Sequence, residues 1–483
     1  MKSIRLTVAV ATLAAVSVSA NPATAKKPAP PFNTALPAIS GTPVEGTALS
    51  ASSGSWSGAV TSFSYQWQSC SGATCANVAA ATASSYTPGP ADWGNTLRVV
   101  VTAANNVGRT AATSAPTATV TAPPGTPDTA YQLNSAHNGV TPDAFWTGAV
   151  KRWTTNLGAS ISYPLIVGHQ VFAVAANGSS TNPRLYALNA DTGAVQWGPI
   201  QLGGTYPWAG LTFDAGRVFT VNSSGTMEAF DAATGTLNWS TQLPGQYSFS
   251  SPPTATGGLV FTGGAGSGGT LYAVNESDGS LAWSQPVMNG DNSSPAVSAT
   301  GVYVSYACGQ TYDFTPTSGT LLWHYSTACE GGGGKTPVLA NGSLYVRDAL
   351  YPGVFDASSG TLLSSFASSG PAPAVSSSNV FDLQGGTLSA SGTAPGAPVN
   401  WTFAGDGSLS SAPVVAGGLV FEGGTTGNVY ALSVTTGQVA WSANAGAPVA
   451  APDEQNVSQP LTGLAASGGL LVVPAGDTLV GFR

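Results

Sequence analysis

The chain has 483 residues, of which 42% are apolar and 7% are charged, and its formal net charge is −8 at pH 7. An ordinary soluble domain has about 25% charged residues, and the few basic residues here, 13 Lys and Arg, argue against a nucleic-acid partner. The 12 Trp, 15 Tyr and 16 Phe argue against disorder, so the 61 Gly and 34 Pro predict many turns between short strands and an all-β fold.

Residues 1 to 25 have the features of a secretory signal. Lys2 and Arg5 precede an apolar run from Leu6 to Ala20, and A-x-A-like cleavage sites follow. The run is too short to span a bilayer, although an uncleaved anchor is the alternative interpretation. No later apolar stretch reaches 18 residues. We therefore expect a protein without a membrane span that is secreted to the medium or the cell surface.

The first region after the signal is predicted to be a β-sandwich. Residues 26 to 32 form a linker rich in Pro, Lys and Ala, and residues 33 to 121 follow it. Strand-like runs at residues 63–67 and 97–102 lie between Gly, Ser and Asn turns, which is typical of a sandwich. A Pro-rich linker at residues 122 to 127 ends the region.

This region resembles the immunoglobulin-like modules of bacterial secreted and surface proteins. The resemblance covers roughly 90 residues and rests on short motifs: Gly54-Ser55-Trp56-Ser57-Gly58, Tyr65-Gln66-Trp67, Cys70 and Cys75, Tyr86, Asp92-Trp93-Gly94, and Val101 to Asn105 followed by Gly108. The resemblance implies a spacer or adhesive unit.

The four cysteines fit an oxidising compartment. Cys70 and Cys75 are five positions apart, and Cys308 and Cys329 are 21 positions apart. Local pairing of each couple is the simplest of the three possible connectivities, so two disulfides are expected. Metal binding is the rival interpretation, but C-x-x-C spacing and nearby histidines are absent.

From about residue 128 to residue 483 the chain repeats itself. The clearest unit runs from Ser411 to Trp441, and an earlier copy begins at Ser251. The closing aromatic residues recur at intervals of 35 to 44 residues: Trp153, Trp197, Trp239, Trp283, Trp323, Phe366, Trp401 and Trp441. A period near 40 with several strands per unit predicts a β-propeller.

Each repeat is predicted to form one four-stranded blade. Its D/N-x-x-T-G turn places Gly at a positive-φ position, and its Trp fills the wedge between neighbouring sheets. Thr478 to Arg483 has the pattern of a third strand, and Ala149 to Trp153 has that of a fourth strand, so the two ends should complete one blade. Eight aromatics predict eight blades. Seven is the alternative, because the unit from residue 366 to 401 lacks a clear T-G turn.

These tandem copies, with the opening Gln132 to Gly139, resemble β-propellers with pyrroloquinoline-quinone-type repeats. That family includes quinone-dependent alcohol and sugar dehydrogenases, and also non-catalytic scaffolds such as the outer-membrane assembly lipoprotein. The dehydrogenases carry an adjacent Cys-Cys pair, a calcium site and a catalytic Asp. No two cysteines are adjacent in this chain and no basic cluster could hold the quinone carboxylates. We therefore expect no cofactor, and the quinone with calcium is an unsupported alternative.

Nothing in the sequence indicates a hydrolase either. The three histidines are His137, His169 and His324, and no Ser lies in a G-x-S-x-G motif. His137 is predicted to lie in the lead-in loop and His324 at a blade edge, both in structural roles. No catalytic or metal-binding residue is assigned.

The loops before the first strands of the blades are predicted to meet at one mouth of the central channel. The candidate binding residues in these loops are Asp291, Glu330, Lys335, Asp406, Asp453, Glu454 and Trp208. Tyr163 lies in an equivalent loop. Such carboxylates would form a negative funnel that attracts cations or basic segments. The glycines at residues 331–334 could close over a ligand. The alternative is that these are solvated loop residues.

The leading hypothesis is a secreted, non-catalytic binding or scaffold protein. One face of its propeller would bind an extracellular glycan, a cell-envelope component or a protein. The alternatives are a quinone-dependent dehydrogenase-like enzyme and an envelope assembly factor.

Overall fold

The computed structural model describes residues 27, 29–176, 182–266, 268–290, 292–327, 329, 331–348, 350–366 and 368–483. The predicted signal at residues 1 to 25 lies outside this part of the chain, as do Asp291 and Glu330 of the predicted mouth. The protein is all-β, and the described helical turns are the short 3-10 segments η1 (Pro90–Asp92) and η2 (Tyr131–Leu133). None of the described helices has the length and apolar character needed to cross a membrane.

The chain divides into two compact units. The first contains residues 1–88 and 95–120, and the second contains residues 89–94 and 121–483. In the described part of the first unit, the sheets have the strand orders β1-β4, β2-β3-β7 and β6-β5-β8-β9. The strand bounds are β1 Phe32–Ala35, β2 Ile39–Ser40, β3 Leu49–Ala51, β4 Ser55–Ser57, β5 Ser62–Ser71, β6 Thr74–Asn77, β7 Ser85–Tyr86, β8 Thr96–Ala104 and β9 Arg109–Thr113.

The core of the first unit is built around Trp67. Its side chain is fully buried, its ring lies 5.6 Å from that of Tyr86, and its Nε1 donates a 3.0 Å hydrogen bond to the carbonyl oxygen of Ala83. The predicted disulfide between Cys70 and Cys75 joins the neighbouring strands β5 and β6. The immunoglobulin-like assignment of this unit stays a prediction.

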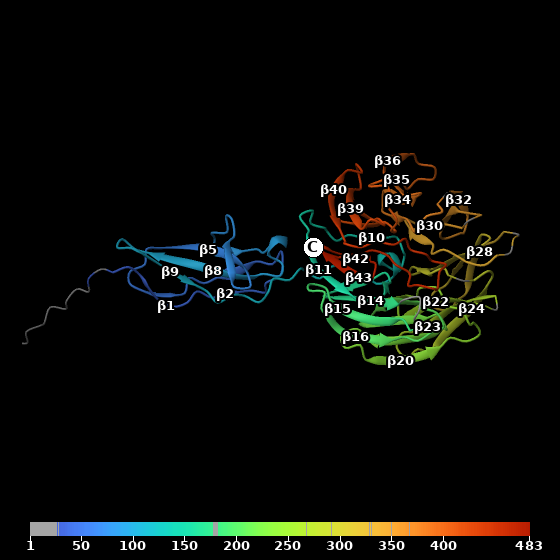
Figure 1. Cartoon of the computed structure of the whole chain (residues 1–483), viewed down its shortest axis with the longest axis horizontal. Coiled ribbons are helices and arrows are strands. Elements are labelled where there is room, and N and C mark those ends of the chain that lie inside the picture. The colour runs from blue at the N-terminus through green and yellow to red at the C-terminus, as the bar shows by residue number, and fades with distance from the viewer. Residues whose placement is uncertain are drawn as a thin grey trace, which may run out of the picture. The chain divides into compact units, whose positions relative to one another are not determined.

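The second unit is a β-propeller whose sheets follow one another around a ring (Figure 1). Its described residues form eight sheets, and each is built on four mainly antiparallel strands. We interpret each sheet as one blade. Two sheets have an additional strand, because β13 also pairs with β14 and β10 adds in parallel to β37.

The first half of the second unit contains the strands between residues 140 and 287. They are β10 Val140–Thr141, β11 Lys151–Asn156, β12 Ser160–Ile161, β13 Leu165–Val167, β14 Gln170–Ala176, β15 Arg184–Asn189, β16 Val195–Gln201, β17 Ala209–Asp214, β18 Arg217–Asn222, β19 Thr226–Asp231, β20 Leu237–Gln242, β21 Thr254–Thr256, β22 Leu259–Ala265, β23 Gly269–Asn275 and β24 Leu281–Val287.

The remaining strands follow in the same order. They are β25 Ala296–Val297, β26 Val302–Tyr306, β27 Gln310–Phe314, β28 Leu321–Tyr325, β29 Val338–Ala340, β30 Ser343–Val346, β31 Gly353–Asp356, β32 Leu362–Ser365, β33 Ala374–Val375, β34 Asn379–Gln384, β35 Thr387–Gly392, β36 Val399–Phe403, β37 Val414–Ala416, β38 Leu419–Gly423, β39 Asn428–Ser433, β40 Val439–Asn444, β41 Ala465–Ser467, β42 Leu470–Ala475 and β43 Thr478–Phe482.

The ring is closed by strands from its two ends. Strand β11 pairs antiparallel with β43, so that Trp153 lies opposite Gly481 and Asn156 lies opposite Thr478. The sheet has the order β11-β43-β42-β41. The prediction that the two ends complete one sheet is confirmed, and the closure leaves no long sheet edge exposed at the junction.

Tryptophans connect neighbouring sheets as predicted. Among the described residues, seven indole Nε1 groups each donate to a carbonyl of the following sheet or its preceding segment: Trp153 to Ala190, Trp197 to Ala232, Trp239 to Glu276, Trp283 to Pro316, Trp323 to Ala357, Trp401 to Val434 and Trp441 to Ala149. Six of these rings also lie against the turn glycine of the next sheet, as Trp239 does against Gly279.

The aromatic expected at Phe366 is the exception. Ser364 pairs with Val354 at the place where Trp239 pairs with Ala229, so Ser364 occupies the tryptophan position of this sheet. Phe366 follows the end of β32 and packs edge-on against Tyr345 of its own sheet, with ring centroids 5.4 Å apart. Phe366 is therefore not a wedge between sheets.

A lead-in strap, residues 128–139, runs along the inner strands of the propeller. Its carbonyl groups accept hydrogen bonds of 2.6–2.9 Å from inner-strand or adjoining N–H groups of five sheets: Thr129 from Phe213, Ser135 from Val297, Ala136 from Leu339, Asn138 from Val375 and Gly139 from Val415. These donors face the channel and would otherwise need water. The strap therefore contributes to the stability of the ring.

Candidate functional site

A cavity of about 460 Å³ opens between the β25–β28 and β29–β32 sheets. Four separate stretches of chain line it: Ser305 to Cys308, Gly331 to Lys335, the residues Arg347, Asp348 and Leu350, and Gln455 from the long loop between β40 and β41. We call it the mouth cavity. Its size is within the usual range of small-ligand sites, about 300–1,000 Å³.

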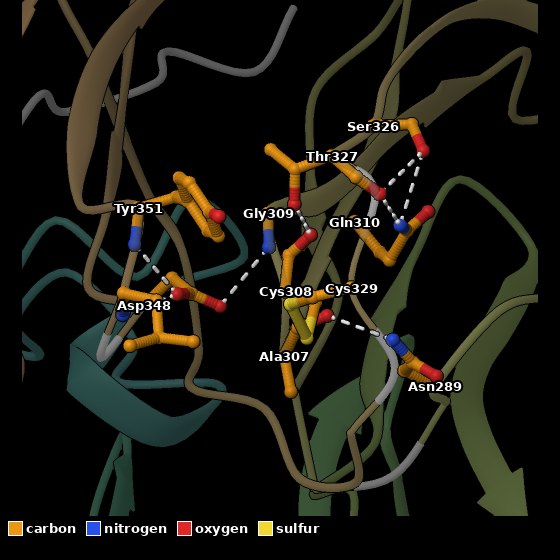
Figure 2. The surroundings of a disulfide bond; sticks show 11 residues. Asn289, Ala307, Cys308, Gly309, Gln310, Ser326, Thr327, Cys329, Asp348 and Tyr351 are labelled. Atoms are coloured by element: carbon orange, nitrogen blue, oxygen red, sulfur yellow. Dashed lines mark hydrogen bonds between the residues drawn. A yellow bond between two sulfur atoms is a disulfide. The ribbon is translucent and has the colours of Figure 1, made fainter.

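A disulfide holds one wall of the mouth cavity (Figure 2). The predicted bond between Cys308 and Cys329 joins the β26–β27 hairpin to the loop that follows β28. Cys308 has a φ of 64°, a left-handed conformation that is uncommon outside Gly, Asn and Asp. The equivalent hairpin between β34 and β35 has Gly385 in this conformation, with a φ of 54°. The wall thus holds a cysteine where a glycine is the usual choice.

Hydrogen bonds fix the same hairpin from three directions (Figure 2). Thr327 Oγ1 donates to the carbonyl oxygen of Cys308 at 2.5 Å, and Asn289 Nδ2 donates to that of Ala307 at 3.1 Å. The Asp348 carboxylate accepts the Gly309 N–H at 3.2 Å. It also accepts the N–H groups of Leu350 and Tyr351 at 2.7 and 2.8 Å, so Asp348 ties two sheets together.

A buried ion pair forms the floor of the cavity region. Arg347 Nη2 lies 2.6 Å from Glu454 Oε1, and both side chains are almost fully buried. Arg347 also donates to the carbonyl oxygens of Thr336 and Gly370 at 3.0 Å, and Glu454 Oε2 accepts the Thr336 N–H at 2.6 Å. Burial alone would raise the pKa of Glu454, but the charge and hydrogen bond of Arg347 outweigh it and lower the pKa. The pair anchors the long loop to the β29–β32 sheet.

Lys335 supplies a cation to the mouth cavity. Its side chain is half-buried, and its Nζ donates to the carbonyl oxygen of Ser369 at 2.9 Å. Burial lowers the pKa of Lys335, and the nearby positive charge of Arg347 lowers it further.

The structure brings together three of the predicted mouth residues. Lys335 lines the cavity, Glu454 lies beneath it, and Asp453 accepts a 3.2 Å hydrogen bond from the N–H of the lining residue Gln455. Asp406 instead accepts hydrogen bonds from Ser408, Thr426 and Asn428 in an exposed turn, where these donors lower its pKa.

The two predicted aromatic residues are core residues. Trp208 is 1% exposed and belongs to a buried cluster with Phe219 and Phe249. Tyr163 is 2% exposed and donates from its hydroxyl to the carbonyl oxygen of Leu211 at 2.5 Å. Their loop positions alone do not separate a mouth residue from a core residue, because the same loops enter the core.

Sequence reasoning missed Arg347 and Asp348, and it placed Gln455 in a mouth loop without singling it out as a binding residue. Arg347 directly follows the apolar strand β30 and is one of 13 basic residues, which is a signal that could have singled it out. Asp348 and Gln455 have no such signal. Their positions depend on how two loops fold.

The histidines are engaged away from the cavity. Buried His137 lies in the strap, with Nδ1 2.6 Å from the carbonyl oxygen of Tyr131 and Nε2 2.9 Å from that of Pro295. His169 pairs with Asp191 at 3.1 Å, and His324 stacks on Tyr312 with ring centroids 3.9 Å apart. All three histidines of the chain are described, and none lines the mouth cavity.

The described residues do not fit a pyrroloquinoline quinone with calcium. The quinone is a flat tricarboxylate, whereas Arg347 is already paired and Lys335 is the other cation of the mouth cavity. Tyr131, Tyr163 and Leu461 belong to one buried cluster with inner-strand residues. In the described ranges, no group of three His, Cys, Asp or Glu side chains is placed to hold a metal ion. No chemical step is derived through such a group.

The family follows from a comparison of the sequence with known families. Residues 184–349 and 353–483 match the model described as "Outer membrane protein assembly factor BamB". The chain belongs to this family. No curated protein matches the sequence.

Solved structures of the family and of quinoproteins share the propeller fold. BamB from Moraxella catarrhalis is 19% identical with a TM-score of 0.50, and the match covers 69% of this chain and 97% of that one. Quinohemoprotein alcohol dehydrogenase from Comamonas testosteroni is 13% identical with a TM-score of 0.58, over 74% of this chain and 80% of that one. At these identities the likeness establishes the fold and not the activity.

Proposed function

We propose that this protein is a secreted, non-catalytic holder, and that the mouth cavity and its rim bind an extracellular glycan or a cell-envelope partner. The two disulfides fit an extracellular or envelope location. The proposal rests mainly on one observation: several charged groups around the cavity are already bound to other groups of the protein. Arg347 and Glu454 neutralise each other, and Asp348 fastens two loops.

A catalytic site generally needs a nucleophile or a general base that can reach the substrate. Here the carboxylates of Asp348 and Glu454 accept hydrogen bonds from the protein itself, and the three histidines are engaged elsewhere. A cavity whose carboxylates are already hydrogen-bonded to the protein is suited to binding a ligand without transforming it.

The rim of the cavity supports a larger partner as a second candidate. Leu350 is 66% exposed and Tyr351 is 39% exposed, side by side on the loop after β30. Exposed apolar groups beside a cavity are typical of protein-interaction surfaces. An envelope protein is therefore a second candidate for the ligand, in keeping with the assembly-factor name of the family.

A cavity-filling variant tests the proposal. Gly332 lines the cavity, and a Cβ at this position would meet no atom within 4 Å, so Gly332→Trp adds an indole there without a backbone clash. Gly89→Trp is the matched control, because Gly89 also has open space around its Cβ position.

The full chain is screened on immobilised extracellular polysaccharides and purified envelope proteins. We expect saturable binding that Gly332→Trp weakens at least tenfold and Gly89→Trp leaves unchanged. In parallel, the protein incubated with quinone and calcium should give no dye-linked alcohol oxidation. Turnover in that assay, or binding that Gly332→Trp does not affect, would contradict the proposal.

A further inference from the structure

Lys335 forms no ion pair with any carboxylate that the structure describes. Among the described residues, the ion pairs with N–O distances up to 4 Å are His169–Asp191, Arg347–Glu454 and Arg483–Asp191. An ammonium group has three donors, and the hydrogen bond to Ser369 uses one of them. Lys335 therefore has a charge and donors left for a ligand in the mouth cavity.

Three of the described carboxylates near Lys335 hydrogen-bond to other groups. A fourth, Asp453, acts on Lys335 through its charge but lies beyond the 4 Å of an ion pair. Glu454 is paired with Arg347, and Asp348 accepts three backbone N–H groups. Asp382 accepts hydrogen bonds from Ser368 at 2.7 Å and from Gln384 at 2.6 Å. These groups moderate the field at Lys335, but none forms an ion pair with it.

A half-buried cation without a close ion-pair partner is costly, and a ligand carboxylate that reaches it forms a strong charge-assisted hydrogen bond. Resting on the function proposed above, we propose that the mouth cavity binds a carboxylated sugar, a uronic acid, whose carboxylate pairs with the Lys335 ammonium. The burial that lowers the pKa of Lys335 also limits water around the ion pair, which strengthens it.

The other lining groups favour a sugar over a peptide terminus. The peptide groups of Gly331 and Gly332 and the side-chain amide of Gln455 present donors and acceptors that suit hydroxyl groups. Leu350, which is 66% exposed, offers apolar surface for the C–H face of a sugar ring. About 460 Å³ accommodates one or two sugar rings.

The test uses α-1,4-digalacturonate as the probe, its neutral counterpart galactobiose, and N-acetyl-Ala-Ala as a carboxylate from a peptide. Binding to the full chain is measured by calorimetry at low and at physiological salt. The variant is Lys335→Gln, and the control is Lys151→Gln. Lys151 also donates to a backbone carbonyl, that of Ala445 at 3.3 Å, but it does not line the cavity.

We expect digalacturonate to bind more tightly than galactobiose, with an affinity that falls as salt rises. Lys335→Gln should reduce the affinity for digalacturonate at least tenfold and remove its salt dependence, while Lys151→Gln leaves both unchanged. Lys335→Arg retains the positive charge and should restore a large part of the binding, which keeps the test informative if the Gln variant folds poorly.

Equal binding of galactobiose, undiminished binding by Lys335→Gln, or no binding of either sugar would overturn the proposal. Binding of N-acetyl-Ala-Ala without digalacturonate would overturn it in favour of a peptide C-terminus. The proposed function is tested independently of this proposal. Its test asks whether Gly332→Trp blocks binding of any glycan or envelope protein to the full chain, and that partner need not carry a carboxylate.

Discussion

Trp401 and Gly437 are in contact across neighbouring sheets of the propeller. The Trp401 Nε1 donates a 3.2 Å hydrogen bond to the carbonyl oxygen of Val434, and a Cβ on Gly437 would come within 2.6 Å of the indole ring. The glycine therefore serves two needs at once: a positive φ of 68° and the close approach of a flat ring.

The contact predicts that Gly437→Ala destabilises the propeller through a steric clash. Gly418→Ala is the control, because Gly418 also has a positive φ, 83°, but its Cβ position meets no atom within 4 Å. Urea unfolding should show Gly437→Ala to be less stable than Gly418→Ala by about 1–3 kcal/mol, the usual cost of overpacking. Equal losses would mean that backbone strain alone sets the cost.

His137 should make the propeller less stable in acid. Burial lowers the pKa of His137, although its hydrogen bonds to Tyr131 and Pro295 oppose this effect. In the unfolded chain a histidine titrates near pH 6.5, so below that pH the unfolded state binds more protons and stability falls by up to about 1.4 kcal/mol per pH unit. The loss of stability levels off once the pH falls below the lowered pKa of His137 in the folded state.

His137→Asn removes this component of the pH dependence. The stability deficit of the variant relative to the wild type should therefore shrink between pH 7.5 and pH 5.5 in urea unfolding. His169→Asn is the control, because the His169 side chain is 46% exposed. A deficit for His137→Asn that stays constant with pH would contradict the prediction.

Asp313 should act in the opposite direction. Its side chain is 2% exposed, its Oδ1 has no hydrogen-bond partner among the described residues, and burial raises its pKa to about 7. An aspartate in the unfolded chain titrates near pH 3.9, so the native state binds more protons between about pH 4 and 7 and stability is lost as pH rises through this window.

Asp313→Asn keeps the shape and removes the titration. We expect the variant to gain stability relative to the wild type from pH 4 to pH 7, by up to about 1.4 kcal/mol per pH unit. Unfolding midpoints in urea at pH 4.5, 6 and 7.5 measure the trend. Parallel curves for the two proteins would show that Asp313 is ionised at all three pH values.

The disulfides should differ in what they contribute. Cys308–Cys329 links residues 21 apart and Cys70–Cys75 links residues 5 apart, so loop closure predicts about 3 and about 2 kcal/mol respectively. Paired Cys→Ser variants of each bond, followed by hydrogen exchange within each unit, give the two values. Removal of Cys308–Cys329 alone should also weaken cavity binding, because this bond anchors the wall of the mouth cavity.

The sequence reveals features of this fold that each blade encodes locally. The Trp, the turn glycine and the first-strand pattern recur in one stretch of about 40 residues, so they predict the sheets and even the pairing of Trp153 with the segment before Arg483. Phe366 misleads for the same reason: it has the right residue type but stands two positions beyond Ser364, which takes the tryptophan position.

Contacts between segments that are distant in the sequence could not be predicted from the repeat pattern. The strap bonds through backbone carbonyls, which leave no pattern in the side chains. Glu454 reaches Arg347 from a loop more than 100 positions away, while Asp406, in an equivalent loop, bonds to Thr426 and Asn428 at the nearby β38–β39 hairpin. Loop paths decide which carboxylates meet, and the repeat pattern does not encode those paths.

The most direct test of the account asks where a ligand sits on the full chain. Hydrogen exchange with mass spectrometry is recorded with and without the polysaccharide or envelope protein that binds best in the screen. The account predicts protection in the segments that line the mouth cavity, with no change in the fourth strands of the other sheets. These segments are residues 305–308, 331–335, 347–348, Leu350 and the loop around Gln455. Protection confined to the first unit or to the outer strands, with these segments unchanged, would contradict it.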